Sequence, residues 1–102
     1  MPFFAVIREA SSAWAPGGIV SQPGVDDHAA FMQELAGEGF AVLAGPLAGS
    51  EQHRLRALVI VNAGGQEQIH SRLAEDPWTQ SQRLQITSIE SWNLLVGGER
   101  FS

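Results

Sequence analysis

The sequence contains no cysteine. Disulfides, thiolate nucleophiles and cysteine-based zinc or iron–sulfur sites are therefore excluded. Any chemistry must use histidine, carboxylate, hydroxyl, arginine or backbone groups. Two of the three histidines, His53 and His70, show no ligand spacing with the third, so we expect neither a metal nor another cofactor.

Basic residues and long apolar runs are also scarce. Six arginines stand against eleven Asp and Glu residues, and the net charge of -5 opposes the phosphate backbone of a nucleic acid. No apolar run approaches the ~18 to 20 residues that cross a bilayer, and the opening MPFFAVIREA lacks the basic start and long apolar stretch of a signal peptide. The sequence predicts a cytoplasmic protein that binds neither nucleic acid nor a membrane.

The overall amino-acid composition is typical of a folded domain. Hydrophobic residues make up 44% and charged residues 17%, far from the charge-rich composition of disordered chains. Two separate cores would each need roughly 50 residues or more. We therefore expect residues 1–102 to form a single domain.

Short apolar runs indicate the strands. Runs rich in β-forming residues predict strands at 3–7, 40–44 and 55–61. The second should end at Gly45-Pro46, because proline cannot donate to a continuing ladder. From Leu84 to Val96, apolar residues at even positions predict a long last strand with these side chains on one face.

Two amphipathic segments predict helices. The first begins near the N-cap candidates Asp26 and Asp27 and carries a one-sided stripe with helical spacing, made of His28, Phe31, Met32 and Leu35. The second covers about 66–75 and ends at Asp76-Pro77, because a residue before proline is driven out of the α region. The order β-α-β-β-α-β predicts an α+β, ferredoxin-like fold, an antiparallel sheet with its helices on one face.

The first three predicted strands are apolar on both faces. Two helices can cover only one face of such a sheet, so something else must bury the other. A second copy of the same sheet would do so in a two-fold homodimer. The alternative is that the long loop at 10–24 covers this surface.

Four segments together resemble the YciI-like (YCII-related) family. They are Asp27-His28-Ala29-Ala30-Phe31-Met32, Gly45-Pro46-Leu47, Asp76-Pro77-Trp78 and Ile89-Glu90-Ser91-Trp92, in the family's order across nearly the whole chain. The resemblance implies a dimeric α/β barrel with a pocket in each subunit, and acid-base roles for His28 and Asp76. Many relatives carry Arg or Trp shortly before the helix histidine, where this chain has Pro23-Gly24-Val25, a departure that weighs against carrying over a relative's substrate.

His28 and Asp76 are the catalytic candidates. His28 lies in the first turn of its helix on the apolar stripe, and unperturbed histidine titrates near neutral pH, which suits proton transfer. The alternatives are a buried structural histidine and an Asp-Pro turn whose carboxylate caps nearby amides. We expect the second helix to end at the opposite end of the sheet from the start of the first. A direct pair would then need the partner subunit.

Several further residues are candidates for substrate binding. Trp14 and Trp78 could line a pocket, although large aromatics are more often core. Gly45-Pro46 offers backbone amides near the sheet edge. Arg8 could bind a substrate carboxylate, or Arg8 and Arg56 could instead form ion pairs with Glu51 and Glu90.

These features favour a small cofactor-independent enzyme of the lyase or isomerase type. His28 would move a proton on a small organic acid, a lactone or a hydroxyaromatic. The alternative is a non-catalytic, metabolite-binding or regulatory dimer that uses the same pocket. A haem- or quinone-handling monooxygenase is the least favoured of the three.

Overall fold

The computed structural model describes residues 2–101. Along the chain, its helices and strands are β1 (Phe3–Ala10), α1 (Val25–Gly37), β2 (Ala41–Pro46), β3 (Arg56–Asn62), α2 (Gln66–Leu73), α3 (Pro77–Gln80) and β4 (Leu84–Trp92). Short 3-10 helices are η1 (Ile19–Ser21), η2 (Ser50–Gln52) and η3 (Gly98–Phe101). The predicted β-α-β-β-α-β order is confirmed, with α3 as an unpredicted addition after α2.

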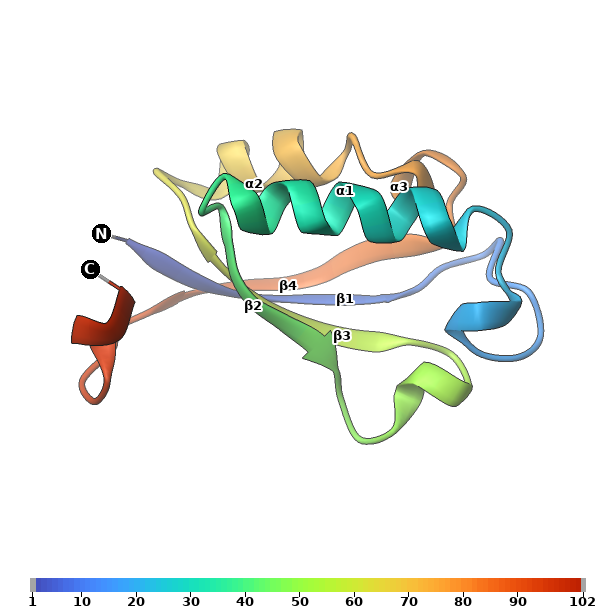
Figure 1. Ribbon diagram of the computed structural model, residues 1–102, viewed down its shortest axis with the longest axis horizontal. Helices are drawn as coiled ribbons and strands as arrows, with labels where there is room; N and C mark the ends of the chain where they lie inside the picture. Colours follow the sequence, from blue (N-terminus) through green and yellow to red (C-terminus); the bar gives the residue numbers. More distant parts are fainter. Residues whose placement is uncertain (1, 102) are drawn as a thin grey trace.

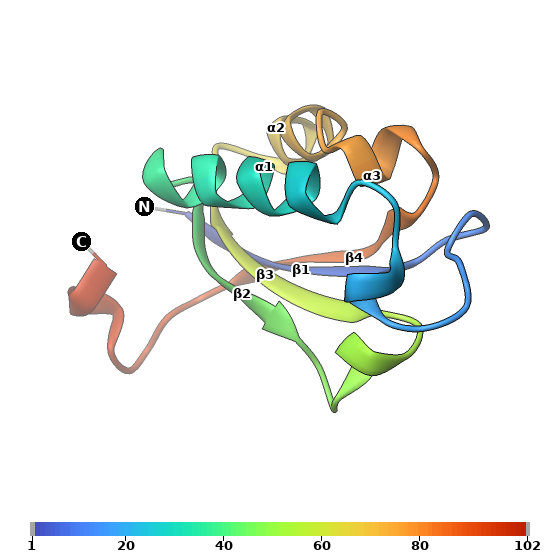
Figure 2. The ribbon, with the colours of Figure 1, turned by 45° about the vertical axis from the view of Figure 1, so that its right-hand side comes forward.

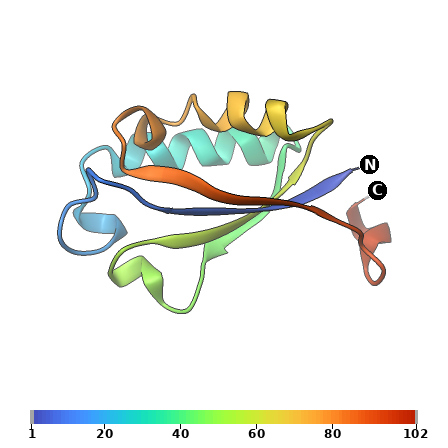
Figure 3. The same cartoon turned by 180° about the vertical axis from the view of Figure 1, so that it is seen from behind.

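The strands form one antiparallel sheet in the order β2-β3-β1-β4. All three α-helices lie on the same face of it (Figure 1), and the view from behind again shows them together above the sheet (Figure 3). The predicted fold class, an α+β protein of the ferredoxin-like type, is confirmed.

The strand directions fix the directions of the helices. β1 and β2 are both antiparallel to β3, so α1 must run back along the sheet between them; β3 and β4 are both antiparallel to β1, so α2 runs the opposite way. α2 therefore runs toward the end of the sheet at which α1 begins, and α3, which follows α2, lies beside the first turns of α1 (Figure 1). The expectation that the end of α2 and the start of α1 lie at opposite ends of the sheet is wrong.

The main core lies between the sheet and the helices. Along β1 every second side chain is buried, and this face, which includes Val6, meets buried side chains of β3, α1 and α2, among them Leu35, Val59, Ile69 and Leu73. Burial of each such side chain contributes roughly 1.5–3 kcal/mol. A second cluster at the far end of the sheet contains Trp14, Trp78 and Leu84.

β4 departs from the predicted alternation because of a β-bulge. Consecutive residues of β1 pair with Ser88 and Ile86, which leaves Thr87 as the extra residue. Beyond the bulge, Ile89 packs against the main core, whereas Trp92 lies with residues of β2 and β3 along a separate surface pocket. The prediction of a single apolar face on even positions is therefore wrong.

Other predicted boundaries also shift. β4 ends at Trp92 rather than near Val96, which is 91% exposed. β1 continues past the polar Arg8-Glu9 pair that was expected to end it, to Ala10, because the side chain of Arg8 is buried and paired. The loop that follows β1 packs Trp14 into the second cluster and does not continue the helix layer (Figure 2).

The face of the sheet away from the helices keeps exposed apolar side chains. Leu43 is 57% and Trp92 45% exposed, and both line a surface pocket with Leu58 and Ile60. This is the surface that the sequence predicts to be buried by a second copy. In the described part of the chain, none of the helices has the length and apolar character to span a membrane.

Candidate active site

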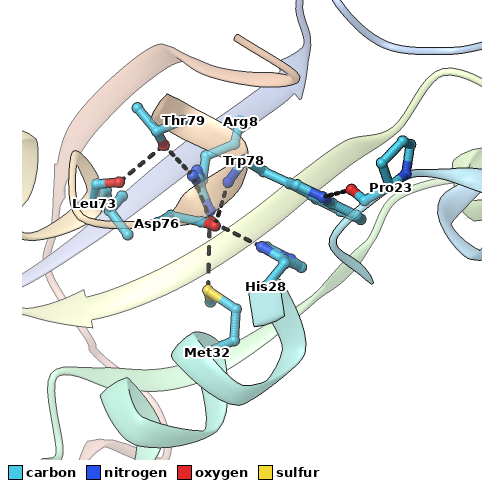
Figure 4. Close-up of polar contacts among 8 residues, drawn as sticks. All are labelled: Arg8, Pro23, His28, Met32, Leu73, Asp76, Trp78 and Thr79. Atoms are coloured by element: carbon cyan, nitrogen blue, oxygen red, sulfur yellow. Dashed lines mark hydrogen bonds and ion pairs between the residues drawn. The ribbon is translucent and has the colours of Figure 1, made fainter. Parts of the chain in front are cut away.

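Charged and aromatic side chains from four elements converge where α1 begins and α2 ends (Figure 4). Arg8 comes from β1, His28 from the first turn of α1, Asp76 from the junction of α2 and α3, and Trp78 from α3. Asp76 is the centre of this group: its carboxylate contacts the Arg8 guanidinium and the His28 imidazole and accepts a hydrogen bond from the backbone N–H of Trp78.

Asp76 occupies its place because it caps α3. Its backbone is extended, as the residue before proline must be, and its Oδ1 accepts a hydrogen bond from the backbone N–H of Trp78 at 2.9 Å. Its Oδ2 lies 2.8 Å from His28 Nδ1 and 3.0 Å from Arg8 Nη2. The capping role and the proposed site role therefore coexist, with one oxygen for each.

The environment of Asp76 keeps its carboxylate ionised. Complete burial by itself would raise the pKa of Asp76. The hydrogen bond from His28, the charges of Arg8 and His28, and the Trp78 amide together outweigh burial, and the pKa lies below its ordinary value. The side chain is thus a buried anion at neutral pH.

Arg8 supplies the buried cation. Its side chain is 2% exposed, and Nη2 also donates to Thr79 Oγ1 at 2.8 Å, which in turn donates to the carbonyl of Leu73 at 2.9 Å. Nη1 lies 3.9 Å from Met32 Sδ. Burial lowers the pKa of Arg8, and the charge of Asp76 opposes this shift; arginine nevertheless stays protonated near neutral pH.

The predicted ion pairs of the arginines are wrong in their partners. Arg8 pairs with Asp76 and not with Glu51 or Glu90, because its position faces the helices and not solvent. Arg56 lies 3.8 Å from Glu9 across the β1–β3 pair.

One imidazole nitrogen of His28 contacts the Asp76 carboxylate, and the other does not. A carboxylate at Nδ1 favours the tautomer that carries its proton there. Nε2 then has a lone pair, and no hydrogen-bond partner for it lies within residues 2–101. The imidazole is 16% exposed, so Nε2 is the nitrogen that a bound molecule can reach.

Trp78 fixes the plane of the imidazole. The two rings are stacked, with centroids 4.0 Å apart and planes 8° from parallel. The indole Nε1 donates to the carbonyl of Pro23 at 2.8 Å and so fastens the loop before α1 (Figure 4). Trp14 packs edge-on against Trp78 at 5.4 Å and donates to the carbonyls of Gly17 and His53.

A pocket of about 160 Å³ lies beside His28. Its lining is mostly apolar and includes Ile19, Met32, Leu55, Val59 and Leu84, with Gly45 and Pro46 of β2 and part of Arg8. The structure thus places His28, Arg8, Gly45 and Pro46 at this pocket. Trp14 and Trp78 are buried behind the imidazole and are not among its lining residues.

Sequence reasoning missed Thr79 and the Arg8–Asp76 pair. Asp76-Pro77 predicts the end of the second helix and a capped turn, but an N-cap followed by proline is also typical of a helix start. With α3 predicted from this signal, Thr79 would have followed in the same turn as the capping carboxylate. Among residues 2–101, no cluster of three or more His, Cys, Asp or Glu residues is suited to a metal ion.

No family model matches the sequence, and no curated protein matches it either. Among solved structures, the chain is similar to 5-chloro-2-hydroxyhydroquinone dehydrochlorinase from Burkholderia phenoliruptrix in complex with 2,5-dihydroxybenzoquinone. The TM-score is 0.62, the identity is 22%, and the alignment covers 89% of this chain and 93% of that one. This likeness shows a shared fold, which in this chain is of the ferredoxin-like type.

Proposed function

We propose that this chain is a small cytoplasmic enzyme that needs no cofactor and uses His28 as a general acid and base. The observation that carries the proposal is the 2.8 Å contact between His28 Nδ1 and Asp76 Oδ2, with Nε2 left for the pocket. Reactions of the lyase or isomerase type need only such a group, because one proton is removed from the substrate and another is returned or lost with a leaving group.

Each member of the group has a chemical task in this proposal. Nε2 takes a proton from the substrate, and Asp76 orients the ring and stabilises the imidazolium that forms. Arg8 holds the carboxylate in its ionised form. A positioned acid-base group of this kind contributes roughly 10² to 10⁴ in rate.

The proposed substrates are a small organic acid, a lactone or a hydroxyaromatic. Removal of a proton next to a carbonyl, or from a ring hydroxyl, leaves the electron pair in an enolate or phenolate. This intermediate either expels a leaving group, as in an elimination, or is protonated at another carbon, as in an isomerisation. The similar structure is a dehydrochlorinase of a hydroxyhydroquinone, which supports the hydroxyaromatic class.

Turnover of the wild-type protein and of His28→Gln tests the proposal. A panel of hydroxyaromatics, lactones and small organic acids is incubated in D2O, and nuclear magnetic resonance follows product formation and deuterium uptake by the substrate. We expect His28→Gln to lose turnover by roughly a hundredfold or more, while His70→Gln, a histidine outside this pocket, retains it. Full turnover in His28→Gln would contradict the proposal. Binding without turnover, unaffected by the substitution, would instead support the non-catalytic metabolite-binding or regulatory module.

We also propose that the active form is a YciI-like homodimer. The exposed apolar side chains on the open sheet face, Leu43 and Trp92 among them, support a second copy as the cover for this face. Light scattering behind a sizing column should give twice the chain mass for the wild type. Leu43→Glu should shift the mass toward one chain without loss of helix signal; a single-chain mass for the wild type would contradict the dimer.

A further inference from the structure

One carboxylate serves two potential cations in the buried group. Asp76 Oδ2 contacts Arg8 Nη2 at 3.0 Å and His28 Nδ1 at 2.8 Å. With neutral His28, the charges of Arg8 and Asp76 cancel and the group carries no net charge. When His28 takes up a proton, the group carries one positive charge in excess, because its single anion is already paired with Arg8.

No other group nearby removes that excess. Among residues 2–101, Asp76 is the carboxylate in ion-pair contact with His28. Asp26 and Asp27, on the same helix, are exposed to water. Arg8 and His28 are the ionisable side chains in the pocket lining, and the remaining lining residues are apolar or small. A protonated His28 therefore faces a pocket in which a single negative charge from a ligand would balance it.

The pocket volume restricts the ligand further. An apolar cavity of about 150 Å³ in another protein is known to hold benzene. The pocket beside His28 is of similar size, about 160 Å³. One ring or an equally small chain fits, with its apolar part against Ile19, Met32 and Leu55.

From this charge balance we propose that the pocket selects a compact ligand with one weakly acidic O–H and binds it as the monoanion opposite a protonated His28. The ligand proton moves to the lone pair of Nε2, and the electron pair of the O–H bond stays on the ligand oxygen. A neutral ligand supplies no negative charge to balance a protonated His28, and a dianion introduces a second negative charge that nothing in the lining balances. This inference rests on the proposed function, because it uses the same imidazole as the base.

Two matched probes test it by binding alone. In para-nitrophenol the ionised form has its own visible absorption band, while the methyl ether, para-nitroanisole, has the same ring and cannot ionise. At a pH below the ionisation of the free phenol, we expect the wild type to develop the phenolate band as it binds the probe. His28→Gln should develop none and bind the phenol roughly tenfold more weakly or worse, while both proteins bind the ether equally.

Equal binding of the ether shows that the pocket survives in His28→Gln. If the variant does not fold, nitrogen-15-labelled histidine is observed in the wild type instead: at the same pH, both ring nitrogens of His28 should carry protons to a greater extent in the phenol complex than in the ether complex. The phenol bound in neutral form, an equal phenolate band in His28→Gln, or no binding of either probe would overturn the inference. Since no turnover is measured, an inactive protein can still pass this test, and a failure leaves the catalytic proposal to the deuterium assay.

Discussion

Two arginine clusters in this molecule are opposites in charge and in burial. At Arg8, one buried carboxylate is shared by a buried guanidinium and a histidine. At Arg72, one guanidinium on α2 is shared by the carboxylates of Glu34, Glu38 and Glu75 at the surface. In the first cluster every charge depends on its neighbours, because water cannot replace a lost partner. In the second cluster water and salt can replace each of them.

The largest effect should follow from removing the shared buried anion. Asp76→Asn keeps the size of the side chain and leaves Arg8 without a counter-charge, and breaking a buried pair in this way costs about 3–5 kcal/mol. Urea denaturation followed by tryptophan fluorescence measures the change. The control is Asp27→Asn on exposed α1, which loses a favourable position near the helix N-terminus and should cost about 1 kcal/mol or less. Equal losses in the two variants would contradict a larger stabilising role for the buried carboxylate than for an exposed one.

Acid should weaken the buried cluster in a defined direction. The pKa of Asp76 is lowered in the folded protein. The ionised carboxylate therefore contributes its full stabilisation at pH values above the ordinary pKa of an unfolded aspartate, about 3.9. This stabilisation is lost as the pH falls through the lower pKa of the folded state. The free energy of unfolding, measured between neutral and strongly acidic pH, should therefore fall below about pH 4. In Asp76→Asn, the decrease in the free energy of unfolding that is due to Asp76 should be absent. An identical pH profile for the two proteins would contradict this prediction.

The stacked tryptophan should affect the histidine more than it affects stability. Trp78→Phe retains an aromatic face for His28 but removes the hydrogen bond to the Pro23 carbonyl, which contributes about 1 kcal/mol and can cost up to ~3 if the carbonyl is left buried and unpaired. Trp78→Leu removes the stack as well and should alter the nitrogen-15 signals of the His28 ring. Trp14→Phe is the matched control, because Trp14 contacts Trp78 and not the imidazole. Unchanged histidine signals in Trp78→Leu would contradict a positioning role.

The smallest effect is expected at the exposed cluster. Its carboxylates raise the pKa of Arg72 through the hydrogen bond with Glu38 and further contacts with Glu34 and Glu75. Arg72→Gln should change the unfolding midpoint only slightly, and the difference from the wild type should shrink as salt is added. A large, salt-independent loss would show that this cluster is not simply a solvated surface network.

Much of the fold could be predicted from the sequence, because hydrophobic spacing reports local structure. The stripe through His28, Phe31 and Leu35 gave the first helix, and apolar runs located the four strands close to their observed positions. The predictions that were wrong concern features that depend on the pairing between strands. The bulge at Thr87 moves Trp92 to the other face, and no local pattern in β4 announces it.

The site shows the same division. Residue type and spacing selected His28 as a candidate, and the family resemblance pointed to both His28 and Asp76. That they meet within one subunit was missed, since the directions of α1 and α2 relative to each other were deduced incorrectly. Arg8 was considered for surface ion pairs, because a strand arginine followed by glutamate gives no local sign of burial.

By itself, the sequence determined the main elements, their order and the chemistry available to them: no thiol, and a histidine in the first turn of an amphipathic helix. Only the tertiary structure decided that residues 8, 28 and 76 share one carboxylate oxygen. The physical reason is that hydrophobic periodicity is a local property, whereas the partners of a buried charge are set by how antiparallel strands and helices bring distant segments together.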